Sequence, residues 1–439
     1  MAPDLYLKAP GEKRPPPTGP DAVLHLNEAG VPGLPIHHHL ELLPAGPAAF
    51  SPGVQAFLLM AAGVWAADKF VPRAAAPDAW TREIILDLPA TPEWPELAPK
   101  LANLLNFLTG DNWKLKLRAV PLHPVGQAPW PHAWRPTAAA LFSGGLDSLV
   151  GAIDGLEAGE RLLLVSHYDF GQLASTQQAL ALALKRHYGK DRVEHLGLRV
   201  QFPRARESTL RSRSLLFLAL GLAAAQAFAP DLPLIIPENG WISLNAPLTL
   251  NRLGPYSTRT THPLFLKGLT ALWREAGINH PLINPYRTQT KGEMLARCRN
   301  PALLKELYPL TVSCARPEAA RWRGVKGGPC GYCYACLMRR AALHRVGRDR
   351  GADYLLDVFA DPETLRHRVQ GGDLRALLFA WKTWEEAPEE IMARLYFPQS
   401  AADAGFDYAA ARGLLARGFE EIGQFIRDKG NQGIKAYLG

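Results

Sequence analysis

The sequence has no long uncharged run of apolar residues and only five cysteines among its 439 residues. A helix that crosses a membrane needs about 20 consecutive, mostly apolar residues, so the first absence excludes the usual membrane-spanning helix. Met1 is followed by Ala, Pro and Asp rather than by the basic and apolar regions of a signal peptide. We therefore expect a cytoplasmic protein with no membrane partner and no disulfide framework.

The charge balance is mildly basic. Lys and Arg number 49 against 41 Asp and Glu, which gives a formal net charge of +8. This excess suits an anionic partner such as a nucleotide, a nucleic acid or an acidic protein, and it is equally compatible with a merely basic surface. A hydrophobic content of 47% with 21% charged residues is typical of a globular enzyme. The length predicts two or three domains.

Three segments differ in their sequence pattern. Residues 1–135 begin with a Pro- and Gly-rich arm that we expect to be disordered, and continue as an N-terminal α/β accessory domain. Five prolines between 121 and 136 predict a linker. In residues 136–345, apolar runs alternate with helical patterns, which predicts an α/β domain with a doubly wound parallel sheet. Residues 346–439 have helical spacing and predict a helical C-terminal region.

The stretch SGGLDS lies between the apolar run AAALF and an amphipathic run. Its two glycines permit positive φ angles and a close approach of an anion to the backbone, and the start of the following helix favours negative charge. Ligands of open parallel sheets lie beyond the carboxyl ends of the strands, so we predict a phosphate site here. The predicted binding residues are Ser143, Gly144, Gly145, Leu146, Asp147 and Ser148. A glycine turn that only packs a helix on a strand is the alternative.

The motif has neither the Lys-Ser/Thr ending of a P-loop nor the GxGxxG spacing of dinucleotide folds. It resembles the pyrophosphate loop of the ATP pyrophosphatase (PP-loop) superfamily, whose fold is adenine nucleotide alpha hydrolase-like, and this resemblance implies ATP as the ligand. Asp147 would then hold Mg²⁺, because a bare carboxylate repels phosphates. A carboxylate that meets only the helix dipole is the alternative. We predict catalytic roles for Ser143, Asp147 and Ser148.

Two later stretches supply candidate nucleotide contacts. The resemblance implies that the backbone from Val165 to His167, in SHYDFGQ, lies beside the adenine. We expect the His167 side chain to be a polar wall rather than a catalytic base. Arg213 stands at the start of a predicted helix, where a cation is disfavoured unless an anion binds, so we predict that it is a catalytic phosphate clamp. An exposed first-turn arginine is the alternative.

The remaining strong motif is a set of cysteines with the pattern C-x15-C-x2-C-x2-C. Such spacing predicts one structural Zn²⁺ in a tetrahedral site with no open position. The predicted ligands are Cys314, Cys330, Cys333 and Cys336. An iron–sulfur cluster is the main alternative, and Cys298 is most simply a core residue.

SGGLDS and this cysteine pattern, in this order, resemble the 7-cyano-7-deazaguanine synthase family. Supporting stretches are YDFGQ, RSRSLLFLALG and TQTKGEML, in which Lys291 matches a lysine of the family. The resemblance covers residues 138–343 and implies an ATP-dependent C–N ligase with Lys291 as a catalytic residue. The family adenylates 7-carboxy-7-deazaguanine, releases pyrophosphate, transfers the acyl group to ammonia and uses a second ATP to form the nitrile.

The stretch from 237 to 263 has no close match to the base pocket of that family. Glu238 can accept paired hydrogen bonds from a guanine-like edge and Asn239 can add a second contact, with a turn or helix cap as the alternative. Arg252, Arg259 and His262 suit a carboxylate or phosphate, or form an exposed basic surface. We predict Glu238, Asn239 and Arg259 as substrate-binding residues.

The chain is about twice as long as members of that family. It resembles enlarged variants encoded in bacterial anti-phage operons, especially those of the Qat type and also the version found in one class of cyclic-oligonucleotide defence systems. This resemblance implies antiviral defence, a protein partner from the same operon and acyl transfer to a protein amine. One alternative is a housekeeping synthase for a modified tRNA base. The other is a nucleic-acid-binding protein with a degenerate nucleotide site, against which the intact SGGLDS argues. A nucleic acid is a compatible partner that the sequence does not require.

Overall fold

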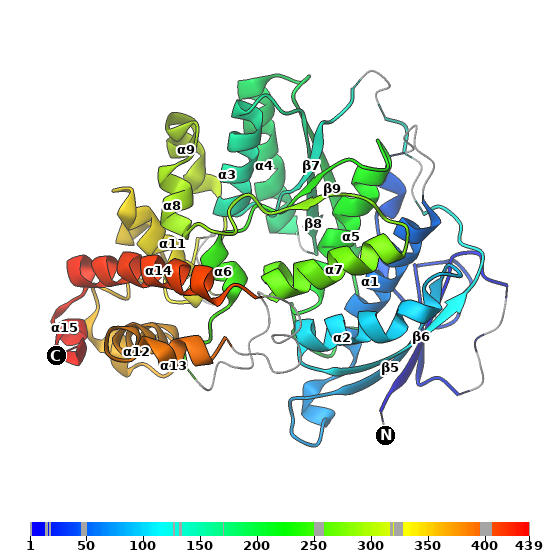
Figure 1. Cartoon of the computed structure of the whole chain (residues 1–439), viewed down its shortest axis with the longest axis horizontal. Helices are drawn as coiled ribbons and strands as arrows, with labels where there is room; N and C mark the ends of the chain where they lie inside the picture. The colour runs from blue at the N-terminus through cyan, green and yellow to red at the C-terminus, as the bar shows by residue number, and fades with distance from the viewer. Residues whose placement is uncertain are drawn as a thin grey trace. The chain divides into compact units, whose positions relative to one another are not determined.

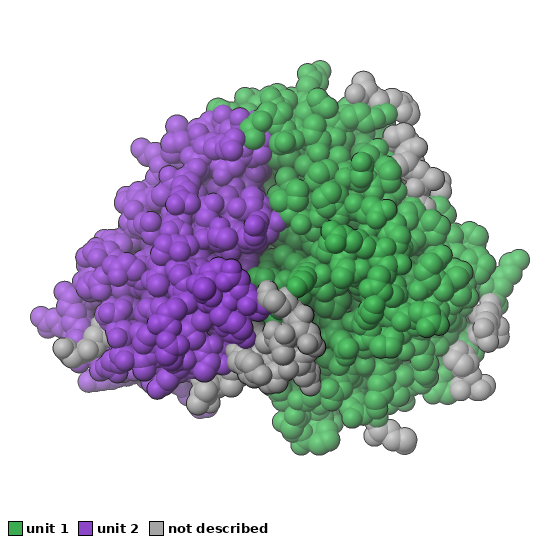
Figure 2. Space-filling model, viewed as in Figure 1, with its two compact units in different colours: residues 1–143, 158–236, 256–283 green, residues 144–157, 237–255, 284–439 purple. Residues whose placement is uncertain are grey.

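The computed structural model forms two compact units, which Figure 2 shows in green and purple. Unit 1 comprises Met1–Ser143, Ala158–Ile236 and Tyr256–Ile283, and unit 2 comprises Gly144–Glu157, Pro237–Pro255 and Asn284–Gly439. The residues that the structure describes are 2–13, 16, 19–44, 51–125, 128–130, 134–169, 171–249, 259–316, 319, 328–395 and 406–438. The domain boundaries near residues 135 and 345 stay a prediction.

Unit 1 contains a first sheet of five parallel strands in the order β3-β2-β1-β5-β6. Figure 1 labels two of them, β5 and β6. The edge strand β6 shows why the segment is a strand, because Trp113 and Leu117 are buried while Lys114 and Lys116 are exposed. The strands are β1 (Asp4–Lys8), β2 (Ala22–His25), β3 (Leu34–Pro35), β5 (Glu83–Ala90) and β6 (Asn112–Ala119).

The second sheet of unit 1 has the order β11-β10-β7-β8-β9-β4 and is parallel except at the edge, where β4 runs antiparallel to β9. Its central strand β7 is buried along its whole length, as expected of a parallel sheet. The strands are β4 (His37–His38), β7 (Ala138–Leu141), β8 (Leu162–Tyr168), β9 (Val193–Gln201), β10 (Leu234–Ile235) and β11 (Leu282–Ile283).

Helices α1 (Pro52–Phe70) and α5 (Arg213–Gln226) pack against each other between the two sheets, α1 against β5 and α5 against β7 and β8. A helix that is apolar on all sides is expected to be buried, and α1 is buried from Gly53 to Asp68. One hydrophobic core therefore includes residues from both sheets. The other helices of unit 1 are α2 (Ala98–Thr109), α4 (Gly171–Tyr188) and α7 (Pro263–Glu275).

Unit 2 is helical in the part of it that the structure describes. A hydrophobic core within unit 2, separate from that of unit 1, includes Trp241, Leu337, Leu377 and Phe419. The helices are α3 (Leu146–Glu157), α6 (Gly240–Leu244), α8 (Lys291–Ala296), α9 (Pro301–Leu307), α11 (Tyr334–Arg345), α12 (Gly372–Glu386), α13 (Pro388–Ala393), α14 (Tyr408–Lys429) and α15 (Gln432–Leu438). The predicted fold class is confirmed: an α/β fold with a parallel sheet, a helical C-terminal region and a four-cysteine cluster. Among the helices described, none has the length and apolarity to span a membrane.

Candidate active site and metal centre

The predicted phosphate turn joins β7 to α3. Gly144 has a φ of +80°, whereas Gly145 lies outside the left-handed region, so one of the two glycines needs the conformational freedom that the sequence suggested. The carbonyl of Gly145 accepts hydrogen bonds from the Ser148 hydroxyl at 2.9 Å and from the Leu149 amide at 3.1 Å. α3 begins at Leu146, within the motif.

A short segment before the first cysteine holds this turn within unit 2. The Val312 amide donates to the Gly144 carbonyl at 3.0 Å, and the Leu146 amide donates to the Ser313 hydroxyl oxygen at 3.3 Å. The next residue, Cys314, belongs to the cysteine cluster. The cluster and the glycine turn therefore share one backbone segment, and Ser313 is a contact that no sequence motif indicated.

Asp147 lies at the centre of a buried polar network and is 7% exposed. Its carboxylate forms an ion pair with Lys291 and accepts hydrogen bonds from the Asn239 side chain at 2.6 Å and the Asn239 amide at 3.2 Å. It also shares a hydrogen bond with the carboxyl group of Glu238. Unit 2 thus brings together four residues that the sequence predicted at three separate motifs.

The two carboxyl groups of this network differ in their pKa. Burial and the neighbouring Asp147 carboxylate raise the pKa of Glu238 well above its usual value. Burial also opposes ionisation of Asp147, but Lys291 and the hydrogen bonds of Glu238 and Asn239 outweigh it and lower the pKa of Asp147. Near neutral pH, Glu238 is therefore the proton donor and Asp147 the ionised acceptor.

Asn239 is also the N-cap of α6, because its side-chain oxygen accepts a hydrogen bond from the Ile242 amide at 3.1 Å. The helix cap, which the sequence analysis gave as an alternative role for this stretch, is therefore present. Glu238 faces Asp147 rather than acting only in a turn. Substrate binding by these two residues stays a prediction.

Helix α14, from the C-terminal region, holds the segment that carries Lys291. The Glu421 carboxylate accepts hydrogen bonds from the Thr290 hydroxyl at 2.7 Å and the Gly292 amide at 3.1 Å. One turn earlier, Arg417 donates to the Glu293 carboxylate at 2.8 Å and the Thr288 carbonyl at 2.7 Å. Thr290 and Glu293 form a capping box, which the letters TKGE could have revealed, but nothing in the sequence indicated its contact with α14.

In unit 1, Gln177 links two of the predicted nucleotide residues. Its side-chain amide donates to the carbonyls of Ser143, at 3.2 Å, and His167, at 3.1 Å. Val165 lies in β8, and its carbonyl accepts a hydrogen bond from the Phe142 amide at 2.7 Å. The sequence missed Gln177, since a glutamine inside an amphipathic helix gives no signal of its own.

His167 has its two ring nitrogens engaged. Nε2 lies 3.1 Å from the Val200 carbonyl, and Nδ1 accepts a hydrogen bond from Arg213 Nε at 3.3 Å. Burial and the adjacent Arg213 guanidinium lower the pKa of His167 to about 3. A ring that stays neutral and hydrogen-bonded in this way supports the expected polar wall rather than a catalytic base.

Arg259 is buried in unit 1, outside the network of Asp147. It donates to the Phe107 carbonyl at 3.1 Å, and its guanidinium lies 5.0 Å from the centre of the Phe107 ring. His262 is the N-cap of α7. The exposed surface that the sequence allowed is therefore absent at these two described positions, and Arg252 lies outside the described residues.

The four predicted metal ligands come together, with their ligand atoms all within 4.8 Å of one another. Two sulfur pairs, Cys314 with Cys333 and Cys330 with Cys336, are 4.0 and 3.8 Å apart. Zinc–sulfur distances of about 2.3 Å give a tetrahedron with edges of about 3.8 Å, so the site fits Zn²⁺. The Cys333 amide also donates to Cys330 Sγ at 3.3 Å, as suits a thiolate. Four sulfur ligands leave no open position for substrate chemistry.

Cys298 is buried away from that cluster, as expected of a core residue. Burial raises the pKa of its thiol to about 12, so the group stays protonated.

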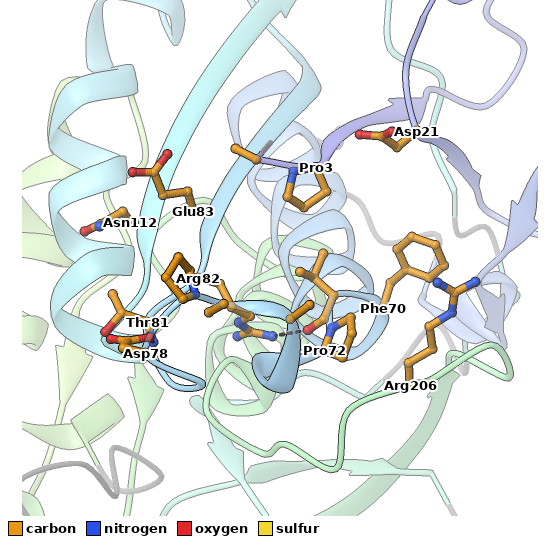
Figure 3. A pocket seen from close by; sticks show the side chains of 15 residues that line it. Pro3, Asp21, Phe70, Pro72, Asp78, Thr81, Arg82, Glu83, Asn112 and Arg206 are labelled. Carbon is orange, nitrogen blue, oxygen red and sulfur yellow. Dashed lines mark hydrogen bonds between the residues drawn. The ribbon is translucent and has the colours of Figure 1, made fainter.

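A pocket of about 980 Å³ opens in unit 1 at the amino ends of β1, β5 and β6 (Figure 3). Its lining includes Pro3, Phe70, Pro72, Arg82 and Arg206. None of the predicted site residues lines it, so we assign it no part in the chemistry.

Comparison with known proteins supports the family resemblance. The chain is 29% identical over 243 residues to a 7-cyano-7-deazaguanine synthase of Synechococcus sp. (strain RCC307), covering 48% of this chain and 96% of that protein. It is 27% identical over 245 residues to the synthase of Parasynechococcus marenigrum (strain WH8102), covering 48% and 94%. No family model matches the chain, and no solved structure matches it significantly. The chain is therefore similar to these synthases over about half of its length.

Proposed function

We propose that this protein is an ATP-dependent C–N ligase that activates a 7-deazaguanine carboxylic acid and passes it to a nitrogen nucleophile. The observation that carries the proposal is the Asp147–Lys291 ion pair at the start of α3, in a chain that matches nearly the whole length of two 7-cyano-7-deazaguanine synthases. ATP and the deazaguanine acid are the proposed substrates.

The reaction has two steps. A carboxylate oxygen of the acid attacks the α-phosphorus of ATP, the bond from that phosphorus to the bridging oxygen breaks, and pyrophosphate leaves. The nitrogen nucleophile then attacks the acyl carbon, the carbon–oxygen bond to AMP breaks, and the nitrogen loses a proton. Adenylation is needed because the oxygen of a carboxylate is otherwise a poor leaving group.

The residues around Asp147 suit the first step. The ionised Asp147 carboxylate offers oxygen ligands of the kind that Mg²⁺ prefers, and bound Mg²⁺ would offset the charge of the phosphates. Lys291 supplies a cation at the same carboxylate. Ser143, Ser148 and the backbone of the glycine turn are proposed phosphate contacts, with Glu238 and Asn239 as proposed substrate contacts. The cysteine site would hold Zn²⁺ as a structural ion.

For biological role we favour anti-phage defence of the Qat type, with a protein amine as the nucleophile and the partner encoded in the same operon. The length of the chain beyond its relatives supports this choice. The housekeeping synthase of a modified tRNA base is equally consistent with the similarity. Expression with its neighbouring genes should reduce phage plaque formation if the defence role holds, and should leave it unchanged if the housekeeping role holds.

The test of the chemistry is pyrophosphate release from ATP and Mg²⁺ in the presence of 7-carboxy-7-deazaguanine. We expect release that depends on the acid and is lost in Asp147→Ala. Asp353→Ala, which removes an exposed carboxylate paired with Arg350, is the matched control and should keep wild-type activity. A folded wild-type protein that releases no pyrophosphate, with ammonia or with a partner protein present, would overturn the proposal.

A further inference from the structure

We propose that Lys69 and Arg213 form an anion site in unit 1 that holds a phosphate group of a nucleotide. Arg213 alone was expected as a clamp, and no residue of the N-terminal region was assigned to the site. The identity of the nucleotide rests on the proposed function, whereas the site itself rests on the contacts of α1 and α5.

A buried hydrogen-bond pair fixes the end of α1 to the start of α5. The Asp68 carboxylate accepts hydrogen bonds from the Ser212 hydroxyl at 2.6 Å and the Ser212 amide at 3.2 Å. Asp68 and Ser212 are fully buried. Lys69 follows Asp68 in the chain and Arg213 follows Ser212, so this pair brings the two cations into one region.

The Arg213 guanidinium has N–H groups that make no hydrogen bond to the described residues. It donates from Nε to His167 Nδ1 and from Nη2 to the His167 carbonyl, both at 3.3 Å. A guanidinium carries five N–H groups, so three have no acceptor among the described residues. No carboxylate in the described ranges lies within 4 Å of it. A partly buried guanidinium whose hydrogen-bond partners are neutral is suited to binding an anion.

Lys69 reaches the same region from α1. Its Nζ lies 4.3 Å from the centre of the Trp65 ring, and the Trp65 ring meets the His167 ring edge-on at 6.2 Å. No described carboxylate lies within 4 Å of Lys69 Nζ. The charges of Arg213 and Lys69 both lower the pKa of His167, as expected of two cations near one ring.

Asp169, which directly follows β8, limits the kind of anion that the proposed site can bind. Its Oδ1 is buried and has no hydrogen-bond partner in the described part of the chain, and its charge favours the charged forms of Lys69 and Arg213. Two cations and one carboxylate leave one net positive charge and one free acceptor. A ligand with a phosphate group and a hydroxyl or amino donor, which a nucleotide has, satisfies both.

The test is the affinity for ATP, measured by titration calorimetry on the full chain. We expect Lys69→Met, which keeps the length of the side chain without its charge, to weaken ATP binding about tenfold or more, and Lys69→Arg to restore most of it. Lys100→Met is the matched control, because Lys100 forms an exposed ion pair with Glu275 in the same unit. It should bind ATP as the wild type does.

Inorganic pyrophosphate serves as a second probe, because it separates this inference from the proposed function. If the wild type binds pyrophosphate but not ATP, and Lys69→Met loses that binding, the anion site stands and the proposed function fails. If a folded Lys69→Met binds both probes with wild-type affinity, Lys69 only packs on Trp65 and the inference is overturned. Thermal unfolding of each variant shows whether it is folded.

Discussion

Glu421 accepts a hydrogen bond from the Thr290 hydroxyl at 2.7 Å, and Thr290 directly precedes Lys291, the partner of Asp147. The C-terminal helix α14 therefore fixes the backbone on which a proposed catalytic cation stands. On the other side of Lys291, Glu421 also accepts a hydrogen bond from the Gly292 amide, and Arg417 of α14 donates to the Glu293 side chain. Lys291 is thus held on both sides by a region outside the resemblance to the synthases.

We expect Glu421→Ala to lower kcat for pyrophosphate release about tenfold to a hundredfold, because a small misplacement of a catalytic group has effects of that size. Arg427→Ala, on the same helix, removes contacts with Glu420, Gln424 and the Trp381 ring but none with the segment that carries Lys291, so it should leave kcat unchanged. Steady-state kinetics with ATP and the deazaguanine acid check the prediction. Equal kcat values for Glu421→Ala and the wild type would remove the positioning role of α14.

Glu238 should make the protein less stable as the pH rises from about 5 to 7. The pKa of Glu238 is raised in the folded protein, so above its unfolded pKa of about 4.3 the folded state binds more protons than the unfolded state. The lowered pKa of Asp147 acts only at more acidic pH, where stability is lost as the pH falls. The slope from one such group is at most about 1.4 kcal/mol per pH unit.

The variant Glu238→Gln keeps a donor toward Asp147 and removes the titration. We expect its unfolding free energy, relative to the wild type, to increase between pH 5 and pH 7, as measured by denaturant unfolding at several pH values. A difference that does not change with pH would show that Glu238 is ionised in the folded protein.

Removal of the metal should abolish activity even though the ion takes no part in the chemistry. The reason is that Ser313 and Val312 hold the glycine turn next to Cys314. We expect one zinc per chain by elemental analysis, and loss of both zinc and pyrophosphate release in Cys333→Ser. Cys298→Ser is the control, and it should retain the zinc. Iron in place of zinc would instead support the iron–sulfur alternative.

Arg82 is the centre of a buried charge cluster in unit 1. Its Nη2 lies 2.5 Å from the Asp68 carboxylate and 2.6 Å from that of Asp111. Arg82→Met leaves the buried Asp68 carboxylate without its main charged partner, whereas Asp111 keeps its ion pair with Arg73 at 2.7 Å. We therefore expect a loss of about 3–5 kcal/mol of stability. Lys114→Met, which removes an exposed pair with Glu83, should cost less than about 1 kcal/mol. Chemical denaturation measures both, and similar losses would contradict the prediction.

Much of the fold follows from local patterns. The alternation of apolar and polar residues in β6, the apolar composition of α1 and the apolar run before SGGLDS match a strand, a helix and a strand, because side-chain periodicity is a property of a single segment. The division into units does not follow the segments, because residues from both sheets share one core. Such packing depends on contacts between residues far apart in the sequence, which the periodicity of a single segment does not predict.

By itself, the sequence determined the chemical types at the site: a glycine turn, an acidic residue at the start of a helix, a lysine and four cysteines. Their spacing was sufficient because each motif acts through neighbouring residues. Only the tertiary structure decided which of them meet: Asp147 with Glu238, Asn239 and Lys291, and the turn with Ser313. The same is true of Glu421, whose carboxylate lies 2.7 Å from the Thr290 hydroxyl across a sequence separation of 131 residues. Contacts over such separations depend on the packing of whole helices, which no local pattern specifies.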